Sequence, residues 1–255
     1  MVALQYTQIG TDNYFKISDS HTLRPFFMSI VSDSDHWMFI SSNGGLSAGR
    51  KNADYALFPY YTDDKITESA EITGSKSIFL VQQGNGQQIW EPFSSRYEGI
   101  HRCSRNLYKH IYGNKIILEE INHDLQLTFQ VEWNSSDKFG FVRKSRLIND
   151  ASREVRISLL DGIQNIMPYG VPSSLQNSAS NLVDAYKRSE LDKTSGLGIY
   201  ALSAIIVDKA EPSEALKANI AWSLGLENPT YLLSSLQLSA FRKGMPLKQE
   251  EDVKE

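Results

Sequence analysis

The feature of this sequence that most constrains its fold is a regular alternation of apolar and polar residues near its middle. From Leu125 to Val131, every second residue is apolar. Because successive side chains of a strand point to opposite faces, such a segment has one buried and one solvated face. An apolar run over 116–121 precedes it, with the turn-forming residues 122–124 between them. The two segments predict an antiparallel hairpin.

Strand patterns also dominate the rest of the first 165 residues, and one more occurs beyond them. Further strands are expected over 37–41, 77–82, 141–148, 155–159 and 198–207, and residues 149–152 have the composition of a tight turn. A parallel sheet needs a helix between successive strands, and this part of the chain shows almost none. The sequence therefore predicts a mainly β fold, an antiparallel sandwich or barrel.

Helical patterns are confined to the C-terminal third. Residues 181–191 have helix-like apolar spacing, and a second helix is expected over 214–219. Residues 220–225 fit a strand equally well, and 231–241 fit a helix somewhat better than a strand. We therefore expect a β-sandwich domain over 1–210. Residues 211–255 are expected to be a helical or mixed segment, either the end of the sandwich or the start of a linker.

Charge and cysteine content exclude several classes of protein. Twenty-six basic and 30 acidic residues give a net charge of −4, which argues against nucleic-acid binding despite a basic cluster over 96–110. The single cysteine, Cys103, excludes an internal disulfide and a zinc site built on several thiolates. The N-terminus lacks the pattern of a signal peptide, and no segment has the roughly 18 apolar residues of a membrane span. We expect a cytoplasmic protein without a membrane partner.

No catalytic motif is apparent. The five histidines lack metal-ligand spacing, so we expect neither a metal nor another cofactor. Adjacent carboxylates such as Glu119 and Glu120 would point to opposite faces of a strand, so adjacency does not make them a glycosidase pair. We therefore assign no catalytic residue.

Two segments could contact a sugar. The glycine-rich segment 41–50 could bring backbone N–H groups to hydroxyls, and the aromatic and acidic segment 55–64 could form a loop that stacks rings on a sugar face. The alternatives are a simple turn after the strand at Trp37 and aromatic residues that belong to the core. The candidate sugar-binding residues are Asn43, Gly44, Gly45, Arg50, Tyr60, Tyr61, Asp63 and Asp64.

The order of several short motifs is more informative than any one of them. Residues 40–47, Ile-Ser-Ser-Asn-Gly-Gly-Leu-Ser, are followed by Trp90-Glu-Pro-Phe and Tyr97-Glu, and then by the turn Arg-Leu-Ile-Asn-Asp-Ala-Ser-Arg at 146–153. Over about residues 25–165 this order resembles the N-terminal part of cellobiose phosphorylases and related disaccharide phosphorylases. The chain departs from that pattern at Leu46, over 53–58 and over 173–193.

The resemblance implies a large antiparallel β-sandwich of the galactose-mutarotase-like (supersandwich) kind. It further implies that this domain precedes an (α/α)6 barrel, which would lie downstream of Glu255 and carry the catalytic acid. The chain would then be a non-catalytic domain of a glycoside phosphorylase or hydrolase, supporting a site for a small sugar or oligosaccharide and contributing to a homodimer.

Two other functions stay open. A freestanding mutarotase-like module would need a histidine and a carboxylate that converge on one sugar, for which His101, His123 and Glu119 or Glu120 are the available residues. A purely structural interaction domain would bind a protein partner and no glycan.

Overall fold

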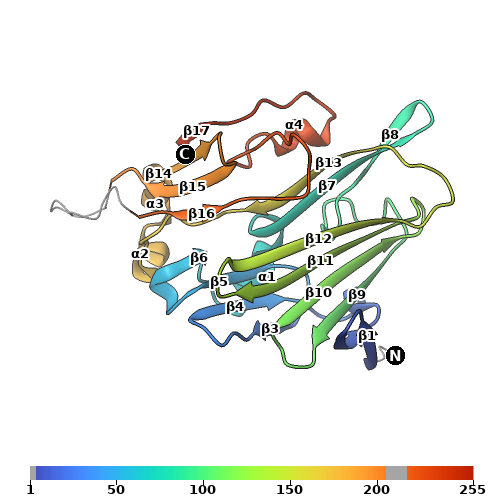
Figure 1. Cartoon of the computed structure of the whole chain (residues 1–255), viewed down its shortest axis with the longest axis horizontal. Coiled ribbons are helices and arrows are strands. Elements are labelled where there is room, and N and C mark those ends of the chain that lie inside the picture. Colours follow the sequence, from blue (N-terminus) through green and yellow to red (C-terminus); the bar gives the residue numbers. More distant parts are fainter. Residues whose placement is uncertain (1–3, 205–216, 255) are drawn as a thin grey trace.

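The fold is mainly β and antiparallel, as the sequence predicts. The structure is a computed structural model that describes residues 4–204 and 217–254. Its largest sheet, here the long sheet, has six strands (Figure 1). In order across the sheet these are β1 (Leu4–Ile9), β2 (Asp12–Ile17), β9 (Cys103–His110), β10 (Lys115–Asn122), β11 (Leu127–Ser136) and β12 (Gly140–Asn149).

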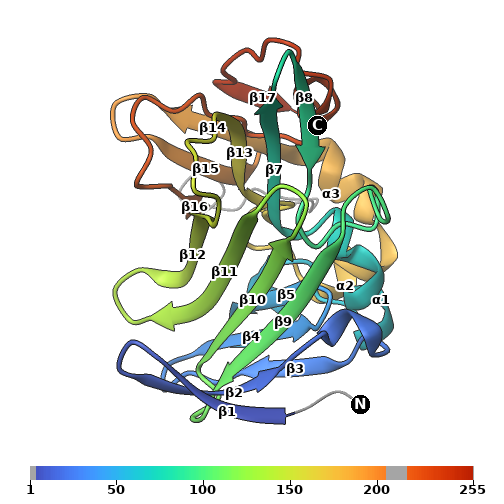
Figure 2. The same cartoon turned by 90° about the vertical axis from the view of Figure 1, so that its right-hand side faces the viewer.

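Three smaller antiparallel sheets complete the described part of the fold. The β4 sheet contains β3 (Phe27–Ile30), β4 (His36–Ser41), β5 (Leu46–Arg50) and β6 (Ala56–Phe58). The β7 sheet contains β13 (Ile157–Gln164), β7 (Gly74–Gln83) and β8 (Gly86–Trp90). The β15 sheet contains β16 (Asn219–Ala221), β15 (Leu197–Leu202), β14 (Lys187–Asp192) and β17 (Asp252–Lys254). Figure 2 shows the long sheet in front, with the β15 sheet beyond its β12 edge.

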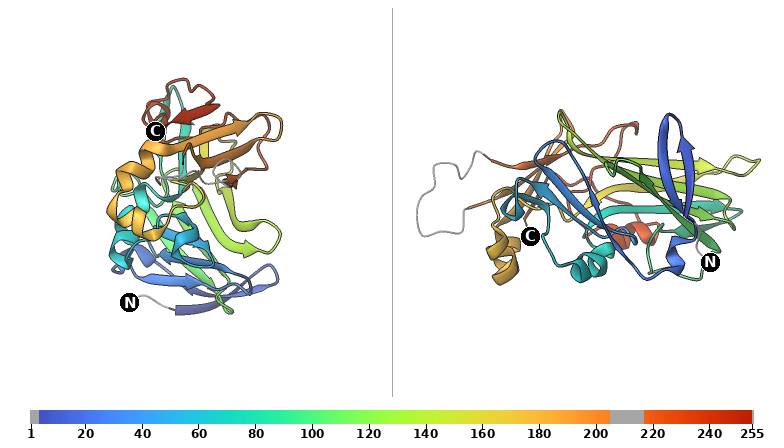
Figure 3. Two further views of the ribbon diagram at one scale, coloured as in Figure 1. Left: turned by 90° about the vertical axis from the view of Figure 1, so that its left-hand side faces the viewer. Right: turned by 90° about the horizontal axis from the view of Figure 1, so that it is seen from below.

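The helices are short and lie at the outside of the molecule (Figure 3). The α-helices are α1 (Asp63–Glu68), α2 (Ser173–Ser178), α3 (Ser180–Tyr186) and α4 (Leu238–Arg242). Three 3₁₀ turns are η1 (Ser20–Thr22), η2 (Ala53–Tyr55) and η3 (Ser69–Glu71). Among the described residues, no helix has the length and apolar composition that crossing a membrane requires.

The predicted central hairpin is confirmed. Strands β10 and β11 pair with Leu118 opposite Val131, and one face of β11 enters the core. Phe129 and Trp133 on that face are each 2% exposed. Burial of a large apolar side chain stabilises a fold by about 1.5–3 kcal/mol, so this face of β11 contributes strongly to the main core.

Strands β12 and β13 lie in different sheets, although only a short link joins them in sequence. At the start of the link, the backbone N–H of Asp150 donates to the carbonyl of Gln126 and extends the β11–β12 pairing, and the Ala151 N–H donates to Asn149 Oδ1. β13 then pairs with β7 in the β7 sheet. The strands are thus divided among four sheets, so the large two-layer sandwich stays a proposal while the antiparallel class is established.

The helix expected over 181–191 is too long. Helix α3 ends at Tyr186, and Leu191 lies on β14, buried in pairing with β15. The pairing of β14 with two neighbouring strands outweighs the local helical pattern.

The last segment is mixed, and its strands join the β15 sheet across the expected boundary at 210. Most of the helix expected over 214–219 falls outside the described residues, and Asn219 starts β16. The strand alternative for 220–225 is therefore confirmed for its first two residues. The helix expected over 231–241 is confirmed only from Leu238, because α4 is a single short turn.

Candidate functional site

A cavity of about 1000 Å³ lies where the long sheet meets the β7 and β15 sheets. Its lining comes from β11 and β12 on one side, from β6, β7 and β13 at the base, and from β16 with the residues that follow it. Ligand pockets usually measure roughly 300–1000 Å³, so this cavity is at the upper end of that range. Its place between sheets makes it the candidate site.

The base of the cavity is aromatic and rigid. The rings of Phe58 and Trp133 meet edge to face, with centroids 6.1 Å apart, and the side chain of Phe58 is 0% exposed. Trp133 Nε1 donates to Ser75 Oγ over 3.2 Å, which fixes the indole ring. These rings belong to the main core, so the packing of the core sets the shape of the cavity base.

One wall is a network that we call the polar clamp, which joins β12 to β13 and β7. Two guanidinium nitrogens of Arg143 donate to the two carboxylate oxygens of Asp161 over 2.9 and 2.7 Å. The hydroxyls of Ser145 and Ser77 donate to the same carboxylate over 2.6 and 2.5 Å, and Arg143 Nε donates to Ser75 Oγ. The clamp therefore ties the edge of the long sheet to the β7 sheet.

The clamp leaves Asp161 without capacity for acid–base chemistry. Burial alone would raise the pKa of Asp161, but the hydrogen bonds and charge of Arg143 more than offset it, and the pKa is lowered. A general acid needs the opposite, a pKa raised towards neutrality. Asp161 holds the wall together as a carboxylate.

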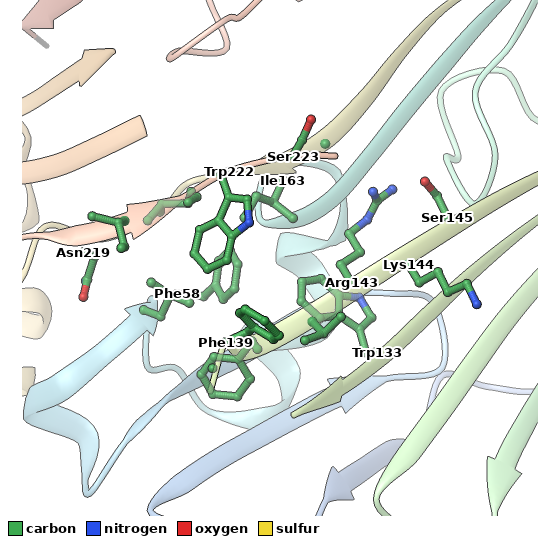
Figure 4. Close-up of a pocket in the computed structure, with 18 of the residues that line it drawn as sticks. Phe58, Trp133, Phe139, Arg143, Lys144, Ser145, Ile163, Asn219, Trp222 and Ser223 are labelled. Carbon is green, nitrogen blue, oxygen red and sulfur yellow. The ribbon is translucent and has the colours of Figure 1, made fainter. Parts of the chain in front are cut away.

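The opposite wall, here called the apolar cover, is exposed and loosely packed. It consists of Ile220, Trp222, Leu224 and Leu226, which are 51%, 41%, 88% and 48% exposed. Trp222 and Phe139, which both line the cavity, contact each other edge to face with ring centroids 6.3 Å apart (Figure 4). The cavity thus combines two accessible rings with a fixed polar wall.

The predicted glycine loop forms a turn whose polar groups bond within the protein. Asn43 and Gly44 make the turn between β4 and β5, where Gly44 has φ +95°. Asn43 Oδ1 accepts from the backbone N–H of Gly45, and its Nδ2 donates to the carbonyl of Thr67. A Cβ at Gly45 would lie 2.0 Å from the carbonyl oxygen of Ile66. The close backbone approach at Gly45 therefore serves helix α1.

Arg50 lies at the opposite end of β5, because residues 46–50 form a strand instead of a loop. Its guanidinium pairs with Asp35 over 2.8 Å, and both residues line the cavity. Of the eight predicted residues, Arg50 alone is in the cavity lining.

The predicted aromatic loop is also divided between other elements. Tyr60 and Tyr61 are 39% and 37% exposed, and the Tyr60 ring meets Trp37 edge to face. Asp63 and Asp64 form the first turn of α1, where the Thr62 hydroxyl donates to Asp64 and lowers the pKa of that carboxyl. Tyr60, Asp63 and Asp64 thus have local partners, and neither they nor Tyr61 line the cavity.

A second, smaller pocket of about 360 Å³ contains Asn43, His101 and Glu120. The carboxylate of Glu120 accepts from Trp90 Nε1, from Arg105 Nε and from the backbone N–H of Phe93. These three donors occupy the Glu120 carboxylate, which argues against a role for Glu120 as the carboxylate of a mutarotase.

Of the other mutarotase candidates, His101 shares this pocket with Glu120, and its Nε2 pairs with the Ile89 carbonyl. Glu119 lies on the opposite face of β10 from Glu120 and accepts from Asn106, Tyr108 and Gln130. His123 pairs with the Ser104 hydroxyl.

The remaining chemistry of the described residues is sparse. Burial, followed by the nearby Glu120 carboxylate, raises the pKa of the Cys103 thiol to about 12, so it is not a thiolate nucleophile at neutral pH. Within 4–204 and 217–254, no group of three or more metal-ligating side chains is present.

Apart from Arg50, the residues that build the cavity were not predicted as a site. Trp133 continues the alternation of Leu127 and Phe129, so its burial could have been predicted. Arg143 interrupts an apolar strand, which is a signal for an inward charge. The partner of that charge, Asp161, cannot be inferred without knowing how the two sheets meet.

Comparison with known proteins adds no relative: no protein-family model and no curated protein matches this chain.

Proposed function

We propose that this chain is a non-catalytic β domain of a carbohydrate-active enzyme and that its cavity binds a sugar. The domain would be of the galactose-mutarotase-like kind, serving a glycoside phosphorylase or hydrolase whose (α/α)6 barrel supplies the catalytic acid. The observation that carries the proposal is the cavity itself, which presents accessible aromatic rings opposite fixed polar groups.

The geometry suits a sugar better than a purely apolar ligand. A pyranose has C–H faces that pack on rings and hydroxyls that need hydrogen bonds. Trp222 and Phe139 supply ring surface (Figure 4), and Ser223 and Asn219 also line the cavity, with Asn219 Nδ2 donating to the Met167 carbonyl. Ligand sites are commonly apolar with a few polar groups that fix orientation.

The carboxylates of the cavity support a non-catalytic role. Among the described residues of the lining, only Asp35 and Asp161 carry carboxylates, and both are ion-paired with arginines. The hydrogen bond from Arg50 lowers the pKa of Asp35, as Arg143 does for Asp161. Both stay ionised and partnered, which fits binding and positioning.

Titration calorimetry with gluco-oligosaccharides tests the proposal. We expect Trp222→Ala and Phe139→Ala each to weaken binding by about tenfold, since an aromatic contact of this kind contributes on the order of 1–2 kcal/mol. The matched control is Tyr112→Ala, which removes a ring that is 75% exposed and does not line the cavity.

The predicted tyrosines provide the contrary outcome. If Tyr60→Ala and Tyr61→Ala abolish binding while Trp222→Ala leaves it unchanged, the cavity is not the sugar site. If no oligosaccharide binds the wild-type chain, the proposed function is wrong.

A structural interaction domain is the second candidate, and the apolar cover favours it. Exposed apolar residues close together mark interaction surfaces, and Leu224 is 88% exposed. Leu236 is exposed to 77% and does not line the cavity, so it provides a matched control. Loss of dimerisation in Leu224→Ser but not in Leu236→Ser, measured by sedimentation, would favour this candidate.

A further inference from the structure

The cavity lining is cationic, although the chain as a whole carries a net charge of −4. Its charged residues are Asp35, Arg50, Lys51, Arg143, Lys144 and Asp161. Because Arg143 and Asp161 neutralise each other in the polar clamp, the excess charge lies elsewhere. Close to Arg50 and Lys51 is one further lysine, Lys217, whose neighbour Ala218 lines the cavity.

Two ammonium groups lie over two adjacent tyrosine rings. Lys51 Nζ is 5.1 Å from the ring centroid of Tyr55, and Lys217 Nζ is 5.6 Å from that of Tyr169. The two rings are 6.1 Å apart between centroids, and both line the cavity. We call Arg50, Lys51, Lys217 and these two tyrosines the basic cluster.

The backbone holds Lys51 in place. Its φ is +58°, in the left-handed region, and its N–H donates to the Asp35 carbonyl over 2.7 Å. The ammonium therefore projects from a fixed turn next to Tyr55.

The nearby carboxylates do not neutralise these lysines. Asp35 pairs with Arg50, and Asp54 accepts from the backbone N–H and hydroxyl of Ser173 over 2.8 and 2.9 Å. Among the described residues, neither Lys51 nor Lys217 forms an ion pair. Each ammonium is held by a ring face, which leaves its charge available to an anion.

One nitrogen of a buried imidazole beside the basic cluster lacks a hydrogen-bond partner among the described residues. His36 lies opposite Arg50 in the β4–β5 ladder, is 8% exposed and lines the cavity. Its Nδ1 pairs with the Ser34 hydroxyl, whereas its Nε2 has no partner in the described part of the chain. Burial, and then the charge of Arg50, lower the pKa of His36 and keep the ring neutral at physiological pH. Buried polar atoms without a hydrogen-bond partner are rare in protein interiors. Nε2 of His36 is therefore available to bond a ligand at this end of the cavity.

We propose that the sugar in this cavity is acidic, and that the basic cluster takes its carboxylate or phosphate. The inference rests on the proposed function, because the sugar ring would stack on Trp222 or Phe139, which are in contact with each other, while its anionic substituent points toward Lys51 and Lys217. Attraction between such exposed charges is modest, and salt screens it. We therefore expect the acidic form of a given sugar to bind more tightly than the neutral form, by a margin that depends on salt concentration.

Calorimetry with matched sugars tests this inference on the whole chain. The probes are D-glucose and D-galactose, each as the neutral sugar, the uronic acid and the 6-phosphate, with inorganic phosphate as a further probe. We expect the acidic form to bind about tenfold more tightly than the neutral sugar at low salt, with the preference shrinking at high salt. Preference for the uronic acid identifies a carboxylate ligand, and preference for the 6-phosphate identifies a phosphate ligand.

Two variants separate the basic cluster from general charge effects. In Lys51→Gln/Lys217→Gln we expect the preference for the acidic sugar to disappear, whereas the control Lys243→Gln, outside the cavity, keeps it. Thermal melts show whether each variant is folded.

The failures are distinguishable. Equal binding of neutral and acidic sugars, or a preference that survives in the double variant, overturns the inference and leaves the proposed function standing. Inorganic phosphate that binds as tightly as both 6-phosphates would indicate an anion site without a sugar and also overturns it. Absence of binding by every sugar overturns the proposed function as well.

Discussion

The two walls of the cavity, the polar clamp and the apolar cover, differ in burial and in hydrogen bonding. In the polar clamp, Arg143 and Asp161 have side chains that are 8% and 17% exposed, and their polar atoms are held by short hydrogen bonds between two sheets. In the apolar cover, Trp222 is 41% exposed, and its nearest ring partner, Phe139, is itself 53% exposed. The clamp wall is largely buried and hydrogen-bonded, and the cover wall is exposed to solvent.

The difference shows how this fold divides stability from recognition. A buried, fully bonded wall keeps its geometry, while exposed apolar side chains gain contacts only when something covers them. The clamp and the aromatic base should therefore determine stability, and the cover should determine binding.

The largest effect is expected at the base. Replacing Trp133 by alanine leaves a cavity in the main core, for which we expect a loss of about 3–5 kcal/mol in the free energy of unfolding. Trp222→Ala, in the cover, should cost less than about 1 kcal/mol because its ring is already partly solvated. Urea denaturation measures both, and equal losses would remove the distinction between the rigid base and the apolar cover.

The next effect is expected in the clamp. Arg143→Met leaves Asp161 buried without its cation, and we expect a loss of about 3 kcal/mol. The double variant Arg143→Met/Asp161→Leu removes the stranded charge and should recover much of that loss. If the single variant is as stable as the wild type, the ion pair does not hold the sheets together.

A smaller effect is expected when the pH is lowered, because ionised carboxylates stabilise the fold. Because the folded-state pKa of Asp161 is lowered, its contribution to stability is present above the ordinary aspartate pKa and is lost as the pH falls through the folded value. Glu71 has a pKa of about 2: burial opposes this lowering, and Lys76 outweighs it, so Glu71 should act in the same direction. We expect the free energy of unfolding to fall on acidification below about pH 4, and less steeply in Asp161→Asn. Identical pH profiles for variant and wild type would contradict this.

The smallest effect on stability is expected in the cover. Leu224→Ser should change the free energy of unfolding by less than about 0.5 kcal/mol, because the side chain is 88% exposed. Binding of a hydrophobic dye should decrease in this variant, and a large loss of stability would show that the cover is packed more tightly than its exposure indicates.

Short-range patterns predicted much of the fold. Alternation gave the β10–β11 hairpin, because one buried face requires a period of two residues. The extent of α3 was wrong because β14 needs residues 187–192 for pairing, a long-range demand that no local pattern contains.

The candidate site was harder to predict for the same reason. Gly45 was predicted to let the backbone approach a sugar closely. In the structure, the group that approaches Gly45 is the carbonyl of Ile66 in helix α1. Arg143 and Asp161 come together only because the chain changes sheet between β12 and β13. A site made where sheets meet depends on how the sheets are arranged, which the sequence does not state locally.

The most direct test of the sugar-binding cavity is a crystal structure of the chain with an oligosaccharide bound. We expect the sugar between the apolar cover and the polar clamp, with a ring face against Trp222 or Phe139. A sugar seated on Tyr60 and Tyr61, or a cavity closed by a second copy of the chain with no sugar in it, would contradict that expectation.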